Sequence, residues 1–193
     1  MKKVLFFSIT ILIITSACKK GANDPSISLR TRKARVVGEW TIKSGTSTLS
    51  ITDVSKATTQ ERFSYTENGY DYVGTDENNL NYTAKGLYFF KMKFEKDGKV
   101  TITETYDNQT TIINGTWNFN AGIGKNKSKE QIIVHATYVS YPVGATKILG
   151  NQNDITYTLT ELRNKKMSLY QEYKEENSDN SALSIVNSYE MKQ

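Results

Sequence analysis

Apolar and polar residues alternate along most of the chain from residue 38 onward. Trp40 and Ile42 alternate with Thr41 and Lys43, and the same period of two recurs around Phe90, Ile102, Trp117, Tyr157, Leu169 and Ile185. Alternation with this period is typical of β-strands with one buried face. Because no helical period is sustained in this region, the sequence predicts an all-β domain of about eight to ten strands.

Short turn sequences separate the alternating stretches. These turns lie at Asn68-Gly69, at Lys96-Asp97-Gly98, at Asp107-Asn108 and at residues 163–166. Short turns join antiparallel neighbours, so we predict an up-and-down meander, with loops at 75–82 and 140–153. Such a meander hides its edges by closing into a barrel or by pairing two sheets.

Residues 131–139 differ from the other strands because their apolar run is nearly continuous. A continuous apolar run is typical of a strand that is buried on both faces, and we expect this for 131–139. Residues 29–37 are expected to form one short helical turn before the first strand.

The alternation assigns a set of large apolar side chains to one face of the sheet. These residues are Trp40, Ile42, Phe90, Met92, Trp117, Tyr157 and Leu159. In a barrel of about eight strands the interior holds either packed side chains or one small ligand. Two interpretations therefore stay open: a ligand-binding cavity lining, or a filled core.

The first seventeen residues have a different pattern. Two lysines precede the apolar run 4–14, and small residues follow at positions 15–17. This order is typical of a secretory signal peptide. A transmembrane helix needs about 20 apolar residues, and this run is shorter. We therefore expect residues 1–17 to direct export.

Cys18 follows Thr15-Ser16-Ala17 directly and is the only cysteine in the chain, so it has no intrachain disulfide partner. Its position resembles the lipobox of bacterial lipoproteins, in which the thiol is alkylated by a diacylglycerol and the new amine is acylated after cleavage. The resemblance implies a membrane anchor at Cys18 with acyl chains such as palmitate, and stable anchoring takes more than one chain. Because no acidic residue follows Cys18, it also implies the outer membrane, facing the periplasm or the cell surface.

Residues 18–35 are polar and are expected to be a flexible tether to the barrel domain, residues 36–193. The densest basic cluster lies in this tether, at Arg30, Arg32, Lys33 and Arg35. One interpretation is attraction to anionic lipid head groups, and the other is a solvated face.

The net charge excludes one class of partner. The chain has 25 basic and 20 acidic residues, and loss of two lysines with the signal peptide leaves a small excess spread along the chain. A basic stripe of the kind that binds nucleic acid is lacking, so no nucleic-acid partner is expected.

Gly38-Glu39-Trp40 after a basic turn resembles the Gly-x-Trp motif that opens lipocalin barrels, and Gly115-Thr116-Trp117 repeats it. Together with the lipobox, residues 94–98 and the hairpin 159–169, these motifs resemble the lipocalin-like lipoproteins of Gram-negative bacteria. The resemblance implies an eight-stranded barrel, often with a cavity for a small apolar ligand. The last strand, 183–191, departs from the family because it lacks the arginine that usually packs over the first tryptophan.

The sequence offers little catalytic chemistry. Its single histidine, His135, lies in mid-strand and is expected to be a packing or surface residue. Metal sites with histidine or cysteine ligands need clustered donors, so neither a metal nor a cofactor is expected. A hydrolase that uses two carboxylates would draw on Glu61, Asp71, Glu104 and Asp154, but their spacing gives no pair. We therefore expect no enzyme.

Two functional hypotheses remain. The first is an exported, lipid-anchored and monomeric protein that binds a small apolar ligand inside a lipocalin-like barrel. The second is a surface module, without an internal ligand, that contacts protein or glycan through exposed tyrosines. The tyrosines named for this role are Tyr65, Tyr70, Tyr72 and Tyr141.

Overall fold

The structure, a computed structural model, describes residues 31–75, 80–120, 130–141, 146–148 and 153–193. The described elements are α2 (Arg32–Val36), β1 (Gly38–Thr52), β2 (Thr58–Thr66), β3 (Tyr70–Thr75), β4 (Asn81–Gly86), β5 (Tyr88–Phe94), β6 (Lys99–Tyr106), β7 (Gln109–Asn120), β8 (Glu130–Ser140), β9 (Thr146–Ile148), β10 (Asp154–Leu162), β11 (Lys166–Glu176) and β12 (Ala182–Lys192). The predicted all-β class and the predicted helical turn are confirmed. None of the described helices is long and apolar enough to cross a bilayer.

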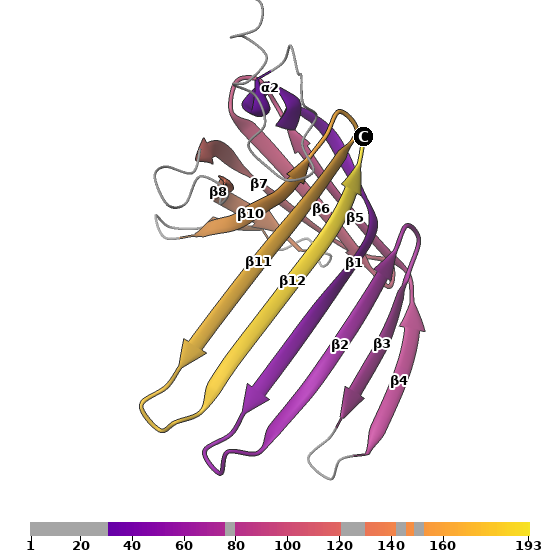
Figure 1. The fold of residues 1–193 in the computed structure, drawn as a ribbon, viewed down its shortest axis with the longest axis vertical. Helices are drawn as coiled ribbons and strands as arrows, with labels where there is room; N and C mark the ends of the chain where they lie inside the picture. Colours follow the sequence, from indigo (N-terminus) through magenta and orange to yellow (C-terminus); the bar gives the residue numbers. More distant parts are fainter. Residues whose placement is uncertain (1–30, 76–79, 121–129, 142–145, 149–152) are drawn as a thin grey trace, which may run out of the picture.

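Eight of these strands form a closed antiparallel barrel in the order β1-β5-β6-β7-β8-β10-β11-β12 (Figure 1). The ring is closed by β12, which pairs with β1 from Thr41 to Thr52. The predicted barrel is therefore confirmed, and it closes although the last strand has no arginine. The short β9 pairs with β8 beside the barrel, inside a segment that was predicted to be a loop.

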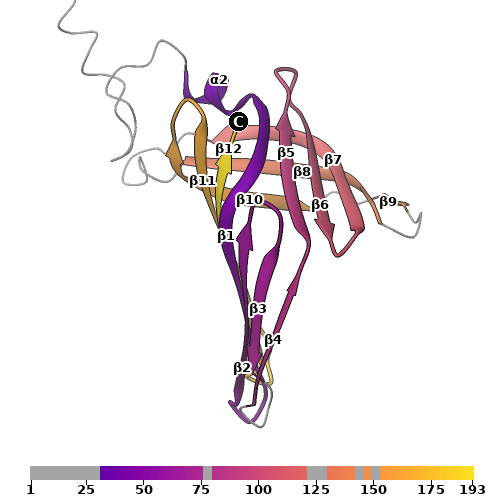
Figure 2. The same ribbon diagram turned by 90° about the vertical axis from the view of Figure 1, so that its right-hand side faces the viewer.

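Strands β2, β3 and β4, together with the outer parts of β1, β12 and β11, form a sheet that projects from the barrel (Figure 2). β1 pairs with β5 only over Gly38–Thr41, and from Ser44 onward the same edge pairs with β2. A register shift between Ile42 and Ser44 marks the change. β3 and β4 continue outward from β2, while β12 and β11 extend on the other side of β1. The projecting sheet therefore has the strand order β4-β3-β2-β1-β12-β11.

The two Gly-x-Trp motifs place tryptophans at the barrel end that lies next to α2. The indole Nε1 of Trp40 donates to the Val36 carbonyl at 2.7 Å, and that of Trp117 donates to the Glu95 carbonyl at 3.0 Å. Gly115 allows a close approach of two strands, because a Cβ there would lie 2.1 Å from the His135 carbonyl oxygen. The second motif thus combines a buried ring with a tight backbone contact.

Helix α2 closes this end of the barrel. Thr31 caps the helix by accepting a hydrogen bond from the Ala34 amide at 3.1 Å, and Val36 is fully buried. Arg32 forms an ion pair with Glu130, and Arg35 donates from Nη1 to the Leu162 carbonyl at 2.8 Å. Neither interpretation of the basic cluster therefore holds for these two arginines, which pack against the barrel: Arg35 is buried, and the side chain of Arg32 is 12 % exposed.

Two further local predictions were wrong. β8 was expected to be buried on both faces, but Ile132 and Val134 are fully buried while the alternating Ile133 and His135 are only half-buried. The loop expected over 75–82 was too long, because β3 includes Thr75 and β4 begins at Asn81, and residues 76–79 lie outside the described residues. In both cases the strand belongs to a sheet with one solvated face, which a short apolar or polar run does not reveal.

Candidate ligand-binding site

The barrel interior is filled next to α2, and at the opposite end one inward-facing side chain reaches solvent. On β6 the side chains of Val100, Ile102 and Glu104 share the inward face, as their pairing with Phe94, Met92 and Phe90 shows. Val100 and Ile102 are each 2 % exposed, whereas Glu104 is exposed. An inward-facing side chain that reaches solvent marks an opening, which we call the mouth.

Tyrosines surround Glu104 at the mouth. The hydroxyl of Tyr88 donates to its Oε1 at 2.9 Å. Burial, and then the negative charge of Glu104, raise the pKa of Tyr88, Tyr65 and Tyr157. Burial also raises the pKa of Tyr189, followed by charges that include Glu104. These hydroxyls therefore remain protonated and can act as hydrogen-bond donors.

Further polar groups lie near this end, where the projecting sheet continues the barrel wall. Gln171 and Asn187 are register partners on β11 and β12, one step beyond the buried pair Leu169 and Tyr189 on the same face. Asn187 donates from Nδ2 to the Gln171 Oε1 at 3.0 Å. The mouth thus combines aromatic rings, amides and one carboxylate.

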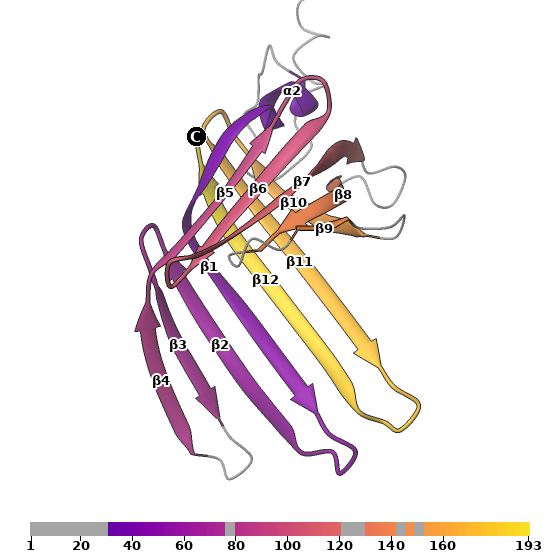
Figure 3. The same ribbon diagram turned by 180° about the vertical axis from the view of Figure 1, so that it is seen from behind.

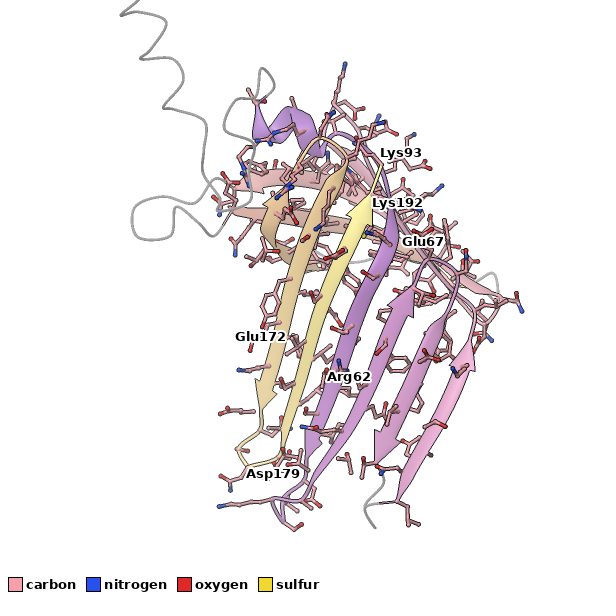
Figure 4. The ribbon with its side chains drawn as sticks, turned by 45° about the vertical axis from the view of Figure 1, so that its right-hand side comes forward. Arg62, Glu67, Lys93, Glu172, Asp179 and Lys192 are labelled. Carbon is pink, nitrogen blue, oxygen red and sulfur yellow. The ribbon has the colours of Figure 1, made fainter. Side chains whose placement is uncertain are left out.

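The two faces of the projecting sheet differ in chemistry. The inner face, which continues the barrel interior, carries the aromatic residues Phe63, Tyr65, Tyr70, Tyr72, Tyr82 and Tyr173. It also carries the aliphatic residues Leu49, Ile51, Leu183 and Ile185. The outer face is mostly serine and threonine, with Arg62, Lys85 and Lys174 among its charges. Figure 4 labels Arg62 and Glu172 of this outer face.

A continuous series of aromatic contacts links the inner face to the barrel core. From the outer edge, Tyr82 contacts Tyr72 at 5.5 Å between ring centroids, and Tyr72 contacts Phe63 at 4.6 Å. Phe63 stacks on Tyr65 at 6.0 Å, and Tyr65 stacks on Tyr88 at 4.1 Å. The outermost ring is 44 % exposed and Tyr88 is 2 % exposed, so the series runs from solvent into the core.

A shallow cleft of about 290 Å³ lies where the projecting sheet separates from the barrel. It is lined by Glu67 and Asn68 of the β2–β3 turn, by Leu87, Tyr88 and Phe89 at the start of β5, and by Thr105 and Asn108. Leu87 is 55 % exposed and Phe89 is 39 % exposed. The cleft gives the outside of this junction an apolar surface.

The seven residues predicted to line a cavity or fill the core all lie in the buried cluster. Trp40, Ile42, Met92 and Trp117 are at most 2 % exposed, and Phe90, Tyr157 and Leu159 are at most 5 % exposed. Packing therefore accounts for these side chains. Two of them also lie next to Glu104: Phe90 is its register partner, and its charge, after burial, raises the pKa of Tyr157. Cys18 lies outside the described residues.

The four candidate carboxylates are distributed over different surfaces. Asp71 pairs with Lys85 at 2.8 Å on the outer face of the projecting sheet. Asp154 contacts the His135 Nδ1 at 2.6 Å on the outside of the barrel. Among the described residues no group of three or more His, Cys, Asp or Glu side chains could hold a metal ion.

The tyrosines named for an exposed surface behave differently from one another. Tyr141 is 43 % exposed, but Tyr70 is 7 % exposed and stacks on Tyr106 at 4.5 Å. Tyr65 and Tyr72 are half-buried on the inner face. The prediction of exposure was therefore wrong for Tyr70, and these rings belong to the inner face instead.

The sequence analysis named Glu104 only as one of four candidate carboxylates and missed the mouth. A signal was present, because Glu104 continues the inward positions of Val100 and Ile102. A carboxylate at a position that alternation assigns to the core is an exception that indicates an opening. The comparisons add no relative, since neither a known family model nor a curated protein sequence matches the chain.

Proposed function

We propose that this protein binds a small molecule with an apolar body at the mouth of the barrel. The observation that carries the proposal is the contrast along one strand face: Val100 and Ile102 are 2 % exposed, and Glu104 is exposed. Ligand sites combine mostly apolar walls with a few placed polar groups. The mouth has this composition, with tyrosine rings as walls and Glu104 as the polar group.

The packed core supports a site at the mouth rather than deep in the barrel. Trp40 and Met92 have no exposed surface, so the half of the barrel next to α2 is occupied by side chains. A ligand therefore contacts the last inward-facing residues, among them Glu104 and its register partner Thr111. The carboxylate of Glu104 supplies the polar contact for the ligand.

A blocking substitution tests the proposal. Residues 31–193 contain every described element and the whole buried cluster, so this fragment is suitable for the assay. We expect it to bind a neutral apolar fluorophore, N-phenyl-1-naphthylamine, saturably and with one site. Thr111→Trp places a large ring in the mouth and is expected to weaken binding at least tenfold.

The matched control is Thr103→Trp. Thr103 precedes Glu104 on the same strand and faces outward, since it pairs with Lys91 and Ile112 on the outside of the barrel. We expect this variant to bind the fluorophore as the parent does. Equal weakening by both variants, or no saturable binding to the parent, would contradict a site at the mouth.

We further propose that the protein is exported and anchored to the outer membrane through acyl chains on Cys18. The support is the sequence of residues 1–18, with its lysines, apolar run and terminal cysteine. In a Gram-negative host, labelled palmitate is expected to enter the wild-type chain and to be absent from Cys18→Ser. Incorporation into both variants would exclude Cys18 as the anchor.

A further inference from the structure

We propose that the inner face of the projecting sheet binds the chain of a long amphiphile whose head group is cationic and lies at the mouth. This inference rests on the proposed function and specifies its ligand class. Three observations support it: the face is mostly apolar and no described element covers its outer part, it is continuous with the mouth, and the charged residues at its described positions are all acidic.

Among the residues that the structure describes, no element covers the outer part of the inner face. Ile51 is 44 % exposed and Tyr173 is 48 % exposed, while Leu49 and Ile185 are half-buried. In Figure 3 the lower part of the six strands is seen with no other strand in front of it, and the edge-on view of Figure 2 agrees. Exposed apolar surfaces of this kind mark interaction sites.

The dimensions of the face suit an extended chain. Leu183 and Tyr189 lie on the same face of β12 and are six residues apart. At a rise of about 3.3 Å per residue, roughly 20 Å separates the tip from the mouth. The stacked rings of Phe63, Tyr65 and Tyr88 make this surface continuous. A chain with one end at Glu104 therefore lies along Ile185 and Leu49 toward the tip.

The charges select the head group. At the described positions of the inner face, Glu61 and Glu175 are the charged residue types and there is no lysine or arginine. The lysines and arginine of this sheet lie on the outer face. An anionic head group would be repelled by Glu104, with no neighbouring cation to compensate. An ammonium group would be attracted by the charge of Glu104 and could contact the faces of the tyrosine rings. A cationic head therefore fits best.

The same charges disfavour a second copy as the occupant. Two inner faces packed against each other would bring Glu61 and Glu175 of one copy toward the acidic groups of the other. Like charges in contact oppose association unless they are compensated. A small cationic amphiphile avoids this repulsion.

Calorimetry on residues 31–193 tests the inference with matched probes below their micellar concentrations. Dodecyltrimethylammonium is expected to bind at least tenfold more tightly than butyltrimethylammonium, which lacks the long chain. It is also expected to bind at least tenfold more tightly than dodecanoate, which has an anionic head. Glu104→Gln is expected to reduce the preference over dodecanoate to less than threefold.

A pair of substitutions on one strand locates the chain. Ile185→Ser removes an apolar contact from the inner face and is expected to weaken dodecyltrimethylammonium binding about fivefold. Val186→Ser removes a similar half-buried side chain from the outer face and is expected to leave binding unchanged. Equal effects of the two variants would overturn the inference.

The remaining outcomes separate this inference from the proposed function. Suppose that Thr111→Trp weakens binding of the neutral fluorophore, but dodecanoate binds as tightly as the cation. The binding site at the mouth would then be supported, and the proposal of a cationic amphiphile would be wrong. If neither class of probe binds, both proposals fall. If the unliganded fragment sediments as a dimer that Ile185→Ser dissociates, the face belongs to a second copy and the inference is overturned.

Discussion

Removing the carboxylate of Glu130 is expected to release helix α2 from the end of the barrel that it closes. The Glu130 side chain is 3 % exposed, and that of its partner Arg32 is 12 % exposed. Burial lowers the pKa of Arg32, and the charge of Glu130 opposes this effect. The two groups therefore form a buried ion pair, in which loss of one member leaves the other charge in a medium of low dielectric constant.

The expected magnitude is large. Breaking a buried ion pair by removing one partner costs about 3–5 kcal/mol of unfolding free energy. For a chain of this size each kcal/mol shifts Tm by about 2–4 °C, so Glu130→Gln is expected to lower Tm by roughly 6–20 °C. The double variant Arg32→Met/Glu130→Leu removes both charges and is expected to recover most of this loss, because apolar residues often replace a buried pair without penalty.

Tryptophan fluorescence reports on the helix directly. The indole of Trp40 donates to the Val36 carbonyl at the end of α2, and the Lys33 Nζ lies 5.7 Å from the centre of a Trp117 ring. These are the only two tryptophans in the chain. In Glu130→Gln, emission is expected to shift to longer wavelength before the cooperative unfolding transition in urea.

The control is an exposed ion pair on the barrel wall. Glu39 lies 3.5 Å from the Lys91 Nζ and its side chain is 53 % exposed, so Glu39→Gln is expected to cost less than about 1 kcal/mol. If Glu130→Gln cost no more than this control and left tryptophan emission unchanged, the ion pair would not be what holds α2 in place.

Three further predictions follow from single contacts. Gly115→Ala is expected to lose about 1–3 kcal/mol in urea unfolding, because the new Cβ meets the His135 carbonyl; an unchanged midpoint would exclude this contact. Burial alone would raise the pKa of Glu161, but Lys166 and Arg163 lower it overall. The ionised Glu161 therefore stabilises the fold above about pH 4.3, and this stabilisation is lost as the pH falls through the lower pKa of the folded state. Lys166→Met should therefore flatten the acid limb of a plot of urea midpoint against pH. Burial and the charge of Glu104 raise the pKa of Tyr88. The stability that its protonated hydroxyl contributes is therefore present below about pH 10 and is lost at higher pH. Tyrosinate absorbance should accordingly show a late ionisation that coincides with unfolding.

The strands and turns of the barrel could be predicted from the sequence because their signals are local. Alternation placed Trp40, Phe90 and Trp117 on one face, and all three are buried. The turn at Asn68-Gly69 was also correct, since the Thr66 amide donates to the Gly69 carbonyl at 2.8 Å between β2 and β3. Residues close in the chain determine both features, so neither requires knowledge of long-range pairing.

The projecting sheet could not be predicted, because it depends on which strand pairs with β1. The alternation of Leu49 and Ile51 fits a barrel strand and a projecting strand equally well. What distinguishes them is the partner of Ser44–Thr52, which is β2 in the structure, whereas Gly38–Thr41 pairs with β5. The length of β1, fifteen residues, was an available signal, since strands commonly have about five or six residues.

The same exchange of partners explains why the barrel has an open mouth. Each edge of a strand can pair with only one neighbour at a given position. From Ser44 onward this edge of β1 pairs with β2, so the first residues of β5 have no pairing with β1. The inward side chains of β1 and β12 then continue past the end of the barrel, where β5 and β6 no longer lie opposite them. Glu104 lies at this boundary, near the end of β6, and none of the described strands covers the apolar face beyond it. The opening and the apolar inner face are therefore consequences of one topological feature, the insertion of β2–β4 between β1 and β5.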